Sequence, residues 1–101
     1  MQKNRLVVSV PTVGALEEYV RERLCEQHRW EADQTTLYRF LIRQASQVTG
    51  LMVHVEGPRA HKGHAIWAGL ENRILLYDSA GQRFAEVQLS DAPDPSQLTM
   101  V

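Results

Sequence analysis

The chain has 101 residues, of which 44% are hydrophobic, 23% charged and 7% aromatic, a composition typical of a soluble globular domain. This length suffices for one compact domain with its own hydrophobic core, and it excludes a two-domain enzyme. Eleven Lys and Arg residues against twelve Asp and Glu residues give a formal net charge of -1. The chain as a whole is therefore not suited electrostatically to nucleic acid or anionic lipid.

The single cysteine, Cys25, has no partner for an intramolecular disulfide, which is typical of a reducing compartment. The apolar run at 6–10 is too short for the core of a signal peptide. No stretch approaches the ~20 apolar residues of a membrane-spanning helix. We therefore expect a cytoplasmic protein that does not associate with membranes.

The first expected elements are a strand and an amphipathic helix. Residues 5–10 form an apolar run without alternation, closed by Pro11, which predicts a strand buried on both faces. Thr12 is then suited to cap a helix that ends near His28. The apolar residues of this helix recur at three- and four-residue steps: Val13, Leu16, Val20 and Leu24.

A second helix is expected between Asp33, which is placed to cap it, and Gly50, which supplies the residue that ends it. Its apolar face consists of Leu37, Phe40, Leu41, Ala45 and Val48. A polar stripe, Arg39, Arg43 and Gln47, has a spacing of four residues. Side chains at this spacing project side by side on a helix, either as a solvated face or as a grip on an acidic partner or a phosphate.

From Leu51 onward the hydrophobic period changes to two, which predicts an antiparallel meander of four strands. The four runs are 51–56, 65–70, 74–77 and 83–89. In the second run we expect Ile66, Ala68 and Leu70 to face the core and Trp67 to face outward. In the last run we expect Phe84 to share the outward face with Glu86 and Gln88.

The sequence thus predicts an α+β two-layer domain: an N-terminal strand and two antiparallel helices packed on a four- to five-stranded, mainly antiparallel sheet. Residues 1–90 form the domain, and 91–101, which contain Pro93 and Pro95, form an extended or disordered tail. The opposite sheet face is expected to expose Met52, His54, Trp67 and Phe84. Such a face seldom lacks a partner, although the tail residues Leu98, Met100 and Val101 are an alternative cover.

The densest polar segment is the loop at 57–64, and loops held by a rigid scaffold are where function concentrates. The predicted binding residues are those of this loop and of the open face: Arg59, His61, Lys62, His64, Trp67 and Phe84. Trp67 is the expected anchor, because buried aromatic residues dominate interface energetics. We therefore interpret the chain as a small non-catalytic protein-binding or regulatory module that holds a protein partner or a second copy as a homodimer.

No cofactor, metal site or catalytic residue is predicted. The spacing of His61 and His64 forms no recognised metal signature, and Asp78-Ser79-Ala80-Gly81 is most simply explained as a turn. A small hydrolase or an RNA-acting protein that uses His61, His64 and Asp78 with nearby Arg and Lys side chains remains an alternative.

The expected element order is similar to that of small bacterial toxins of the RelE type, in which two helices precede a meander. This resemblance implies an RNA-cleaving activity and a basic surface that holds phosphates. The candidates for that surface are Arg59, Lys62, Arg73 and Arg83, with Trp67 and Phe84 for base stacking. The chain is weakly acidic and its basic residues are spread over several elements, so nucleic acid is not the expected partner.

Overall fold

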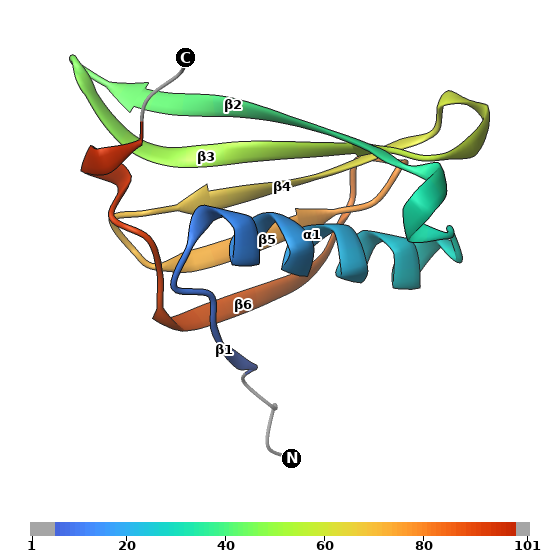
Figure 1. Cartoon of the computed structure of the whole chain (residues 1–101), viewed down its shortest axis with the longest axis horizontal. Coiled ribbons are helices and arrows are strands. Elements are labelled where there is room, and N and C mark those ends of the chain that lie inside the picture. Colours follow the sequence, from blue (N-terminus) through green and yellow to red (C-terminus); the bar gives the residue numbers. More distant parts are fainter. Residues whose placement is uncertain (1–5, 99–101) are drawn as a thin grey trace.

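A computed structural model describes residues 6–98. They form an α+β two-layer domain in which one helix packs on an open six-stranded sheet (Figure 1). The strand order is β1-β6-β5-β4-β3-β2. All neighbouring strands are antiparallel except β1 and β6, which are parallel. The elements are β1 (Val7–Ser9), α1 (Val13–His28), β2 (Thr36–Gln44), β3 (Gln47–Glu56), β4 (Lys62–Ala68), β5 (Arg73–Tyr77) and β6 (Arg83–Asp91). Short 3-10 turns lie at Ala32–Gln34, Pro58–Ala60 and Pro95–Gln97.

The first predicted helix is confirmed as α1. The hydroxyl of Thr12 accepts a hydrogen bond from the backbone N–H of Ala15 at 3.0 Å, so Thr12 is the cap. At the other end Arg29 adopts a left-handed conformation with φ of 60°. The apolar stripe of the helix is fully buried against the sheet; it includes Leu16, Val20 and Leu24.

The second predicted helix is wrong, because this segment forms the β2–β3 hairpin. Two residues, Ala45 and Ser46, connect the strands. The helical period joined residues on both sides of this turn, whereas β2 itself is rich in aromatic and branched side chains, with Tyr38, Phe40 and Ile42 at every second position. The chain therefore begins strand-helix-strand and not strand-helix-helix. The similarity to RelE-type toxins rested on two helices and is not supported.

The first strand was expected to be buried on both faces, but in the structure it is an edge strand. β1 has three residues and pairs only with β6. Val7 is 53% exposed, whereas Val10, just after the strand, is buried. The predicted meander is confirmed by the antiparallel pairing of β3 with β4, β4 with β5 and β5 with β6.

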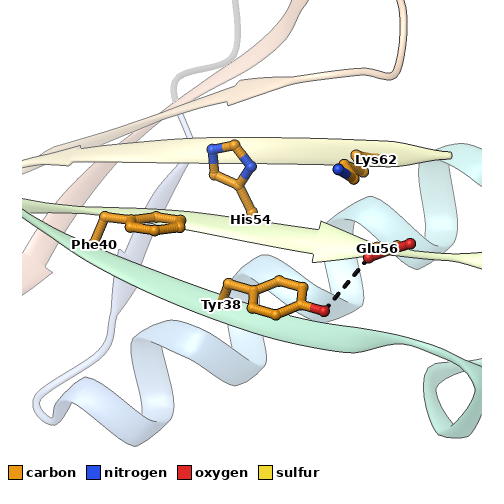
Figure 2. A pocket seen from close by; sticks show the side chains of 5 residues that line it. All are labelled: Tyr38, Phe40, His54, Glu56 and Lys62. Atoms are coloured by element: carbon orange, nitrogen blue, oxygen red, sulfur yellow. Dashed lines mark hydrogen bonds between the residues drawn. The ribbon is translucent and has the colours of Figure 1, made fainter. Parts of the chain in front are cut away.

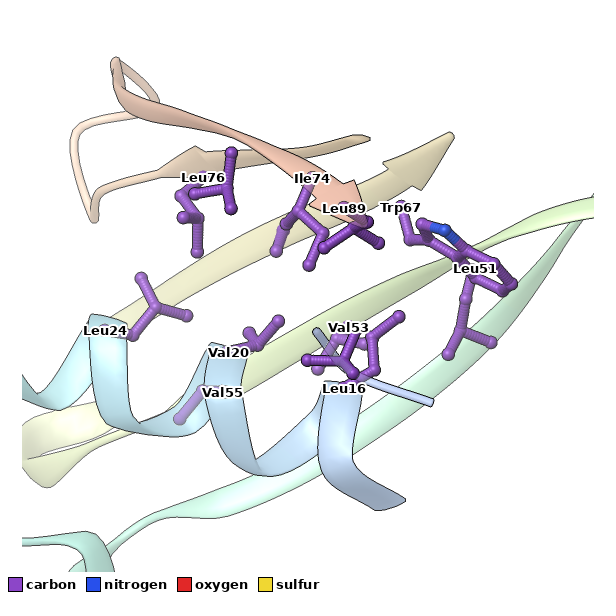
Figure 3. Packing of buried hydrophobic residues seen from close by; sticks show 13 residues of the cluster. Leu16, Val20, Leu24, Leu51, Val53, Val55, Trp67, Ile74, Leu76 and Leu89 are labelled. Atoms are coloured by element: carbon purple, nitrogen blue, oxygen red, sulfur yellow. The ribbon is translucent and has the colours of Figure 1, made fainter. Parts of the chain in front are cut away.

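The core lies between α1 and the inner face of the sheet, and it includes Trp67, which is 1% exposed (Figure 3). The predicted outward orientation of Trp67 is wrong, because β4 has the opposite parity: Ala65 and Trp67 face α1, while Ile66 faces away. A slip of one residue exchanges the two faces of a strand. Gly63 explains how α1 comes so close, because an added Cβ would lie 2.6 Å from the Cδ2 atom of Leu24.

The predicted outward position of Phe84 is likewise wrong, because Phe84 packs against the core instead of lying on the open face. The register of β5 and β6 shifts here: Leu76 pairs with Ala85, and Tyr77 pairs with Arg83. Phe84 is the extra residue at this irregularity. A bulge re-aims side chains locally, and a strict alternation rule therefore assigned Phe84 to the wrong side.

The segment that follows β6 returns to the end of the core. Ala92 and Leu98 pack against the buried cluster, and the Pro95 ring lies beside Gly69 on the inner side of the sheet. Met100 and Val101, which could have covered the open face, lie outside the described residues. In the described part of the chain, no helix has the length and apolar character needed to cross a membrane.

Candidate binding surface

The outer face is the side of the sheet opposite α1, and no helix of residues 6–98 packs on it (Figure 1). Strand alternation places its side chains, because every second residue points away from the core. The outer face comprises Tyr38, Phe40 and Ile42 of β2, Met52, His54 and Glu56 of β3, Lys62, His64, Ile66 and Ala68 of β4, Arg73, Leu75 and Tyr77 of β5, and Glu86 and Gln88 of β6.

A row of aromatic rings crosses four strands of the outer face. Phe40 meets His54 edge to face at 5.3 Å between ring centroids. His54 stacks on His64 at 5.4 Å, and His64 stacks on Tyr77 at 4.7 Å. The spacing of the two stacks follows from the sheet, because neighbouring strands lie ≈ 4.8 Å apart and His64 is paired in register with both His54 and Tyr77. Phe40 pairs with Met52 and reaches His54 diagonally.

His64 of this row has a shifted pKa. Burial lowers the pKa of His64 from its ordinary value of 6.5, and the nearby His54 lowers it further by charge repulsion. The Nε2 atom of His54 lies 3.1 Å from the sulfur of Met52. His64 therefore favours its neutral form, in which one ring nitrogen donates and the other accepts a hydrogen bond.

A small open pocket of about 240 Å³ lies at the β2 end of the ring row (Figure 2). Its wall is formed by Tyr38, Phe40, His54, Glu56 and Lys62. The Tyr38 hydroxyl lies 3.5 Å from Glu56 Oε1, and Glu56 pairs with Lys62 across the β3–β4 ladder. The pocket is smaller than the ≈ 300 Å³ of a drug-sized site, so it suits a single side chain or ring.

The opposite end of the outer face carries charges of both signs. Arg73 Nε lies 2.6 Å from Glu71 Oε1, and the Arg73 guanidinium also contacts Glu86. Arg83 lies 3.6 Å from the same Glu86 and sits over the Tyr77 ring at 5.8 Å. These arginines are thus matched by carboxylates and do not form a free basic patch.

The predicted loop residues lie beside the outer face. Arg59 and His61 are exposed in the loop that joins β3 to β4, and Arg59 and Ala60 both have a φ of 61°. Lys62 and His64 follow on β4 and belong to the outer face. Trp67 and Phe84 are not part of this surface, as described above.

Sequence reasoning placed Met52 and His54 on the open face correctly but missed three of its rings. Tyr38 and Phe40 were hidden because their segment was interpreted as a helix; the alternation of Tyr38, Phe40 and Ile42 was the signal that could have found them. Tyr77 was missed because its strand shows no alternation.

The alternative catalytic set does not assemble in the described residues. Asp78 Oδ1 accepts hydrogen bonds from the backbone N–H groups of Ala80 and Gln82, at 3.0 and 2.9 Å, so Asp78 organises its own turn. Within 6–98 no histidine nitrogen forms an ion pair with a carboxylate. No group of three or more His, Cys, Asp or Glu side chains in this range could hold a metal ion.

Cys25 and His28 lie three residues apart on α1, a spacing at which a thiol and an imidazole could pair as nucleophile and base. Burial raises the pKa of the Cys25 thiol; the positive charge of Arg21 opposes this, and Glu31 and Glu18 add to it. A thiol of this kind is a poor nucleophile. The His28 ring instead stacks on Trp30, at 4.4 Å between centroids.

Comparison with protein-family models, with curated proteins and with solved structures finds no match to this chain.

Proposed function

We propose that the protein is a small non-catalytic binding module whose outer face holds a segment of a protein partner. The observation that carries this proposal is the row of rings from Phe40 to Tyr77 on a face that no helix of the described chain covers. The loop with Arg59 and His61 adds polar groups at one end of the same face. Exposed surfaces of this composition are typical of interaction sites.

The ring row favours a peptide over a nucleic acid. A base needs a free ring face on which to stack, and in this row His54 lies on one side of the His64 ring and Tyr77 on the other. The arginines at the end of the face are paired with Glu71 and Glu86. The His64 ring therefore offers no free face to a base, and Arg73 and Arg83 form no free basic patch at this end of the face.

The partner chemistry follows from what the face offers. Beside the ring row, the next register position holds an apolar row, in which Met52 pairs with Ile66 and Ile66 pairs with Leu75. Ring nitrogens and tyrosine hydroxyls supply hydrogen bonds next to this apolar row. A peptide with two or three apolar side chains flanked by polar groups matches this pattern.

A peptide selection tests the proposal. Random peptides displayed on phage are selected against the full chain, and the best one is titrated into the isotope-labelled protein by NMR. We expect the largest shifts at His54, His64 and Ile66, and we expect Ile66→Glu to weaken binding about tenfold or more. Leu70→Glu is the matched control, because Leu70 is 73% exposed but lies in the β4–β5 turn, away from the outer face.

Two results contradict the proposal: selected peptides that shift residues elsewhere, or an Ile66→Glu variant that binds as well as the wild type. If Ile66→Glu does not fold, His54→Ala provides the same test. His54 is only half-buried, so removing its ring leaves no cavity in the core. Binding of an RNA oligonucleotide that falls with salt and with Arg59→Ala would favour the RNA-acting alternative instead.

A further inference from the structure

We infer that two copies of the chain pair through their β2 strands, antiparallel and about a two-fold axis, so that their sheets become continuous. This inference goes beyond the proposed function, and it concerns the edge of the sheet instead of the outer face alone. It rests on the length of β2, on the exposure of its side chains and on the pattern of its charges.

β2 is an unprotected edge strand. It stands last in the strand order and pairs only with β3. In the described residues, no backbone hydrogen bond joins 36–44 to anything beyond this pairing. Nine residues at about 3.4 Å each present an edge of ~30 Å of backbone N–H and C=O groups. By contrast, the β1 edge has only three residues.

The features that usually blunt an edge are scarce in β2. The strand contains neither Pro nor Gly. The register shift in the hairpin falls on β3: Ile42 pairs with Gly50 and Arg43 with Val48, which leaves Thr49 as the extra residue. β2 therefore runs without a bulge of its own. Its only charged residues are Arg39 and Arg43. Long, regular edges of this kind are templates for pairing with another chain.

The most exposed aromatic side chains of the outer face lie on this same strand. Phe40 is 50% and Tyr38 46% exposed, whereas the residues in the middle of the face are half-buried. The apolar surface that lacks a cover is thus concentrated at the β2 edge. A second β2 strand beside it would cover both rings.

The charges of β2 disfavour the two registers next to the one that aligns its full length. In a symmetric antiparallel pair both outer faces lie on the same side, so that paired residues have the same parity. Centring the pair on Phe40 aligns all nine residues and sets Arg39 opposite Leu41 and Arg43 opposite Leu37. If the centre shifts to Arg39, the Arg39 side chains of the two copies lie opposite each other. If it shifts to Leu41, Arg39 of each copy lies opposite Arg43 of the other. Like charges directly opposite each other are destabilising, and Glu17 Oε2, 2.7 Å from Arg39 Nε, offsets only part of this charge.

The favoured register also joins apolar groups on the outer face. Phe40 meets its own symmetry copy at the axis, and Tyr38 meets Ile42 on each side. Because Tyr38 and Phe40 line the small pocket, the second copy places Ile42 beside each pocket. The dimer therefore extends the ring row across the seam and completes two neighbouring pockets.

The oligomeric state of the full chain tests the pairing. We expect light scattering on a sizing column to give twice the mass of one chain for the wild type. Phe40→Lys sets two like charges at the axis, and we expect it to raise the dissociation constant about tenfold or more. Leu70→Lys, at a more exposed site outside the edge, should remain a dimer. A monomeric wild type, or a dimer that Phe40→Lys does not weaken, overturns the inference.

Cross-linking tests the register independently. In the Cys25→Ser background, Phe40→Cys places two thiols at the axis, where opposite Cα atoms of an antiparallel pair lie about 4.5 to 5.5 Å apart, within the range of a disulfide. Mild oxidation should therefore link Phe40→Cys chains rapidly. Faster linking of Arg39→Cys or Leu41→Cys chains, which report the two shifted registers, overturns the assignment. A wild-type chain that dimerises but binds no selected peptide on its outer face would count against the proposed function alone.

Discussion

The imidazole of His64 lies flat against the phenol ring of Tyr77, with centroids 4.7 Å apart and planes inclined by 7°. These residues face each other in the β4–β5 register, so the strand spacing itself sets the stacking distance. The stack leaves the ring edges, with their nitrogens and hydroxyl, to meet a partner. It also holds His64 in a half-buried position beside His54.

The first prediction is that the protein loses stability between neutral and mildly acidic pH through His64. Burial and then the charge of His54 lower the pKa of His64 in the folded state. The unfolded chain therefore binds more protons in the interval between the two pKa values. This contribution is fully present above the unfolded value of 6.5 and is lost as the pH falls through 6.5 toward the folded value.

Urea unfolding at about pH 8 and about pH 5 measures this loss. In His64→Gln the difference in unfolding free energy between the two conditions should shrink. His54→Gln removes the charge repulsion, so NMR titration should show a higher pKa for His64 in this variant. An unchanged pH dependence in His64→Gln would contradict the assignment.

The second prediction is that Trp67→Ala acts on stability. Trp67 is 1% exposed in the core, and truncating a buried Trp typically costs about 3 to 5 kcal/mol, a large share of the stability of a small domain. Trp67→Phe should cost less, because it leaves a smaller cavity. Urea unfolding measures both variants. Stability equal to the wild type in Trp67→Ala would show that the indole is not part of the core.

The third prediction is that Ala45→Gly stabilises the β2–β3 hairpin. Ala45 is the first residue of a two-residue loop and has a φ of 55°, a conformation that costs a side-chain-bearing residue about 1 to 2 kcal/mol. Glycine removes this cost but loses about 0.5 to 1 kcal/mol of backbone entropy. We expect a net gain of roughly 0.5 to 1 kcal/mol in thermal or urea unfolding.

Ser46→Gly is the control for this prediction, because Ser46 does not have a positive φ. It should be neutral or slightly destabilising. Equal stabilisation by both substitutions would mean that the conformation of Ala45 is not the cause.

The fourth prediction concerns the reactivity of Cys25. Burial raises the pKa of its thiol, and the thiolate is the reacting species. The native protein should therefore react slowly with a disulfide reagent such as Ellman's reagent, and addition of urea should accelerate the reaction strongly. A native rate equal to the rate in urea would contradict the burial of this thiol. Cys25→Ser, which has no thiol, gives the background rate.

The two-layer α+β architecture could be predicted from the sequence, but one of the two predicted helices is a β-hairpin, because the apolar pattern of this segment is ambiguous. The series from Leu37 to Val48 satisfies a helical period, whereas Tyr38, Phe40 and Ile42 recur at every second position, as in a strand. The pairing of Leu37 with Val55 and Leu41 with Leu51 decides between them. Such pairing is tertiary information, which a local window does not contain.

The candidate surface was predictable in kind and only partly in its residues. His54 and His64 lie in the β3 and β4 segments, but their contact depends on the register of the two strands. Trp67 was assigned to the wrong side because Ile66, Ala68 and Leu70 form the longer apolar series. The missing Cβ of Gly63, which lets Leu24 approach the sheet, shows why the core lies on the side of Ala65 and Trp67.

The parallel pairing of β1 with β6 joins the first strand of the chain to the last one. During synthesis on the ribosome, β1 can pair with β6, its one neighbour within residues 6–98, only after β6 has emerged, long after α1 and the β2–β3 hairpin are available to fold. The β1 edge of the sheet is thus closed only by a contact between the two ends of the described chain.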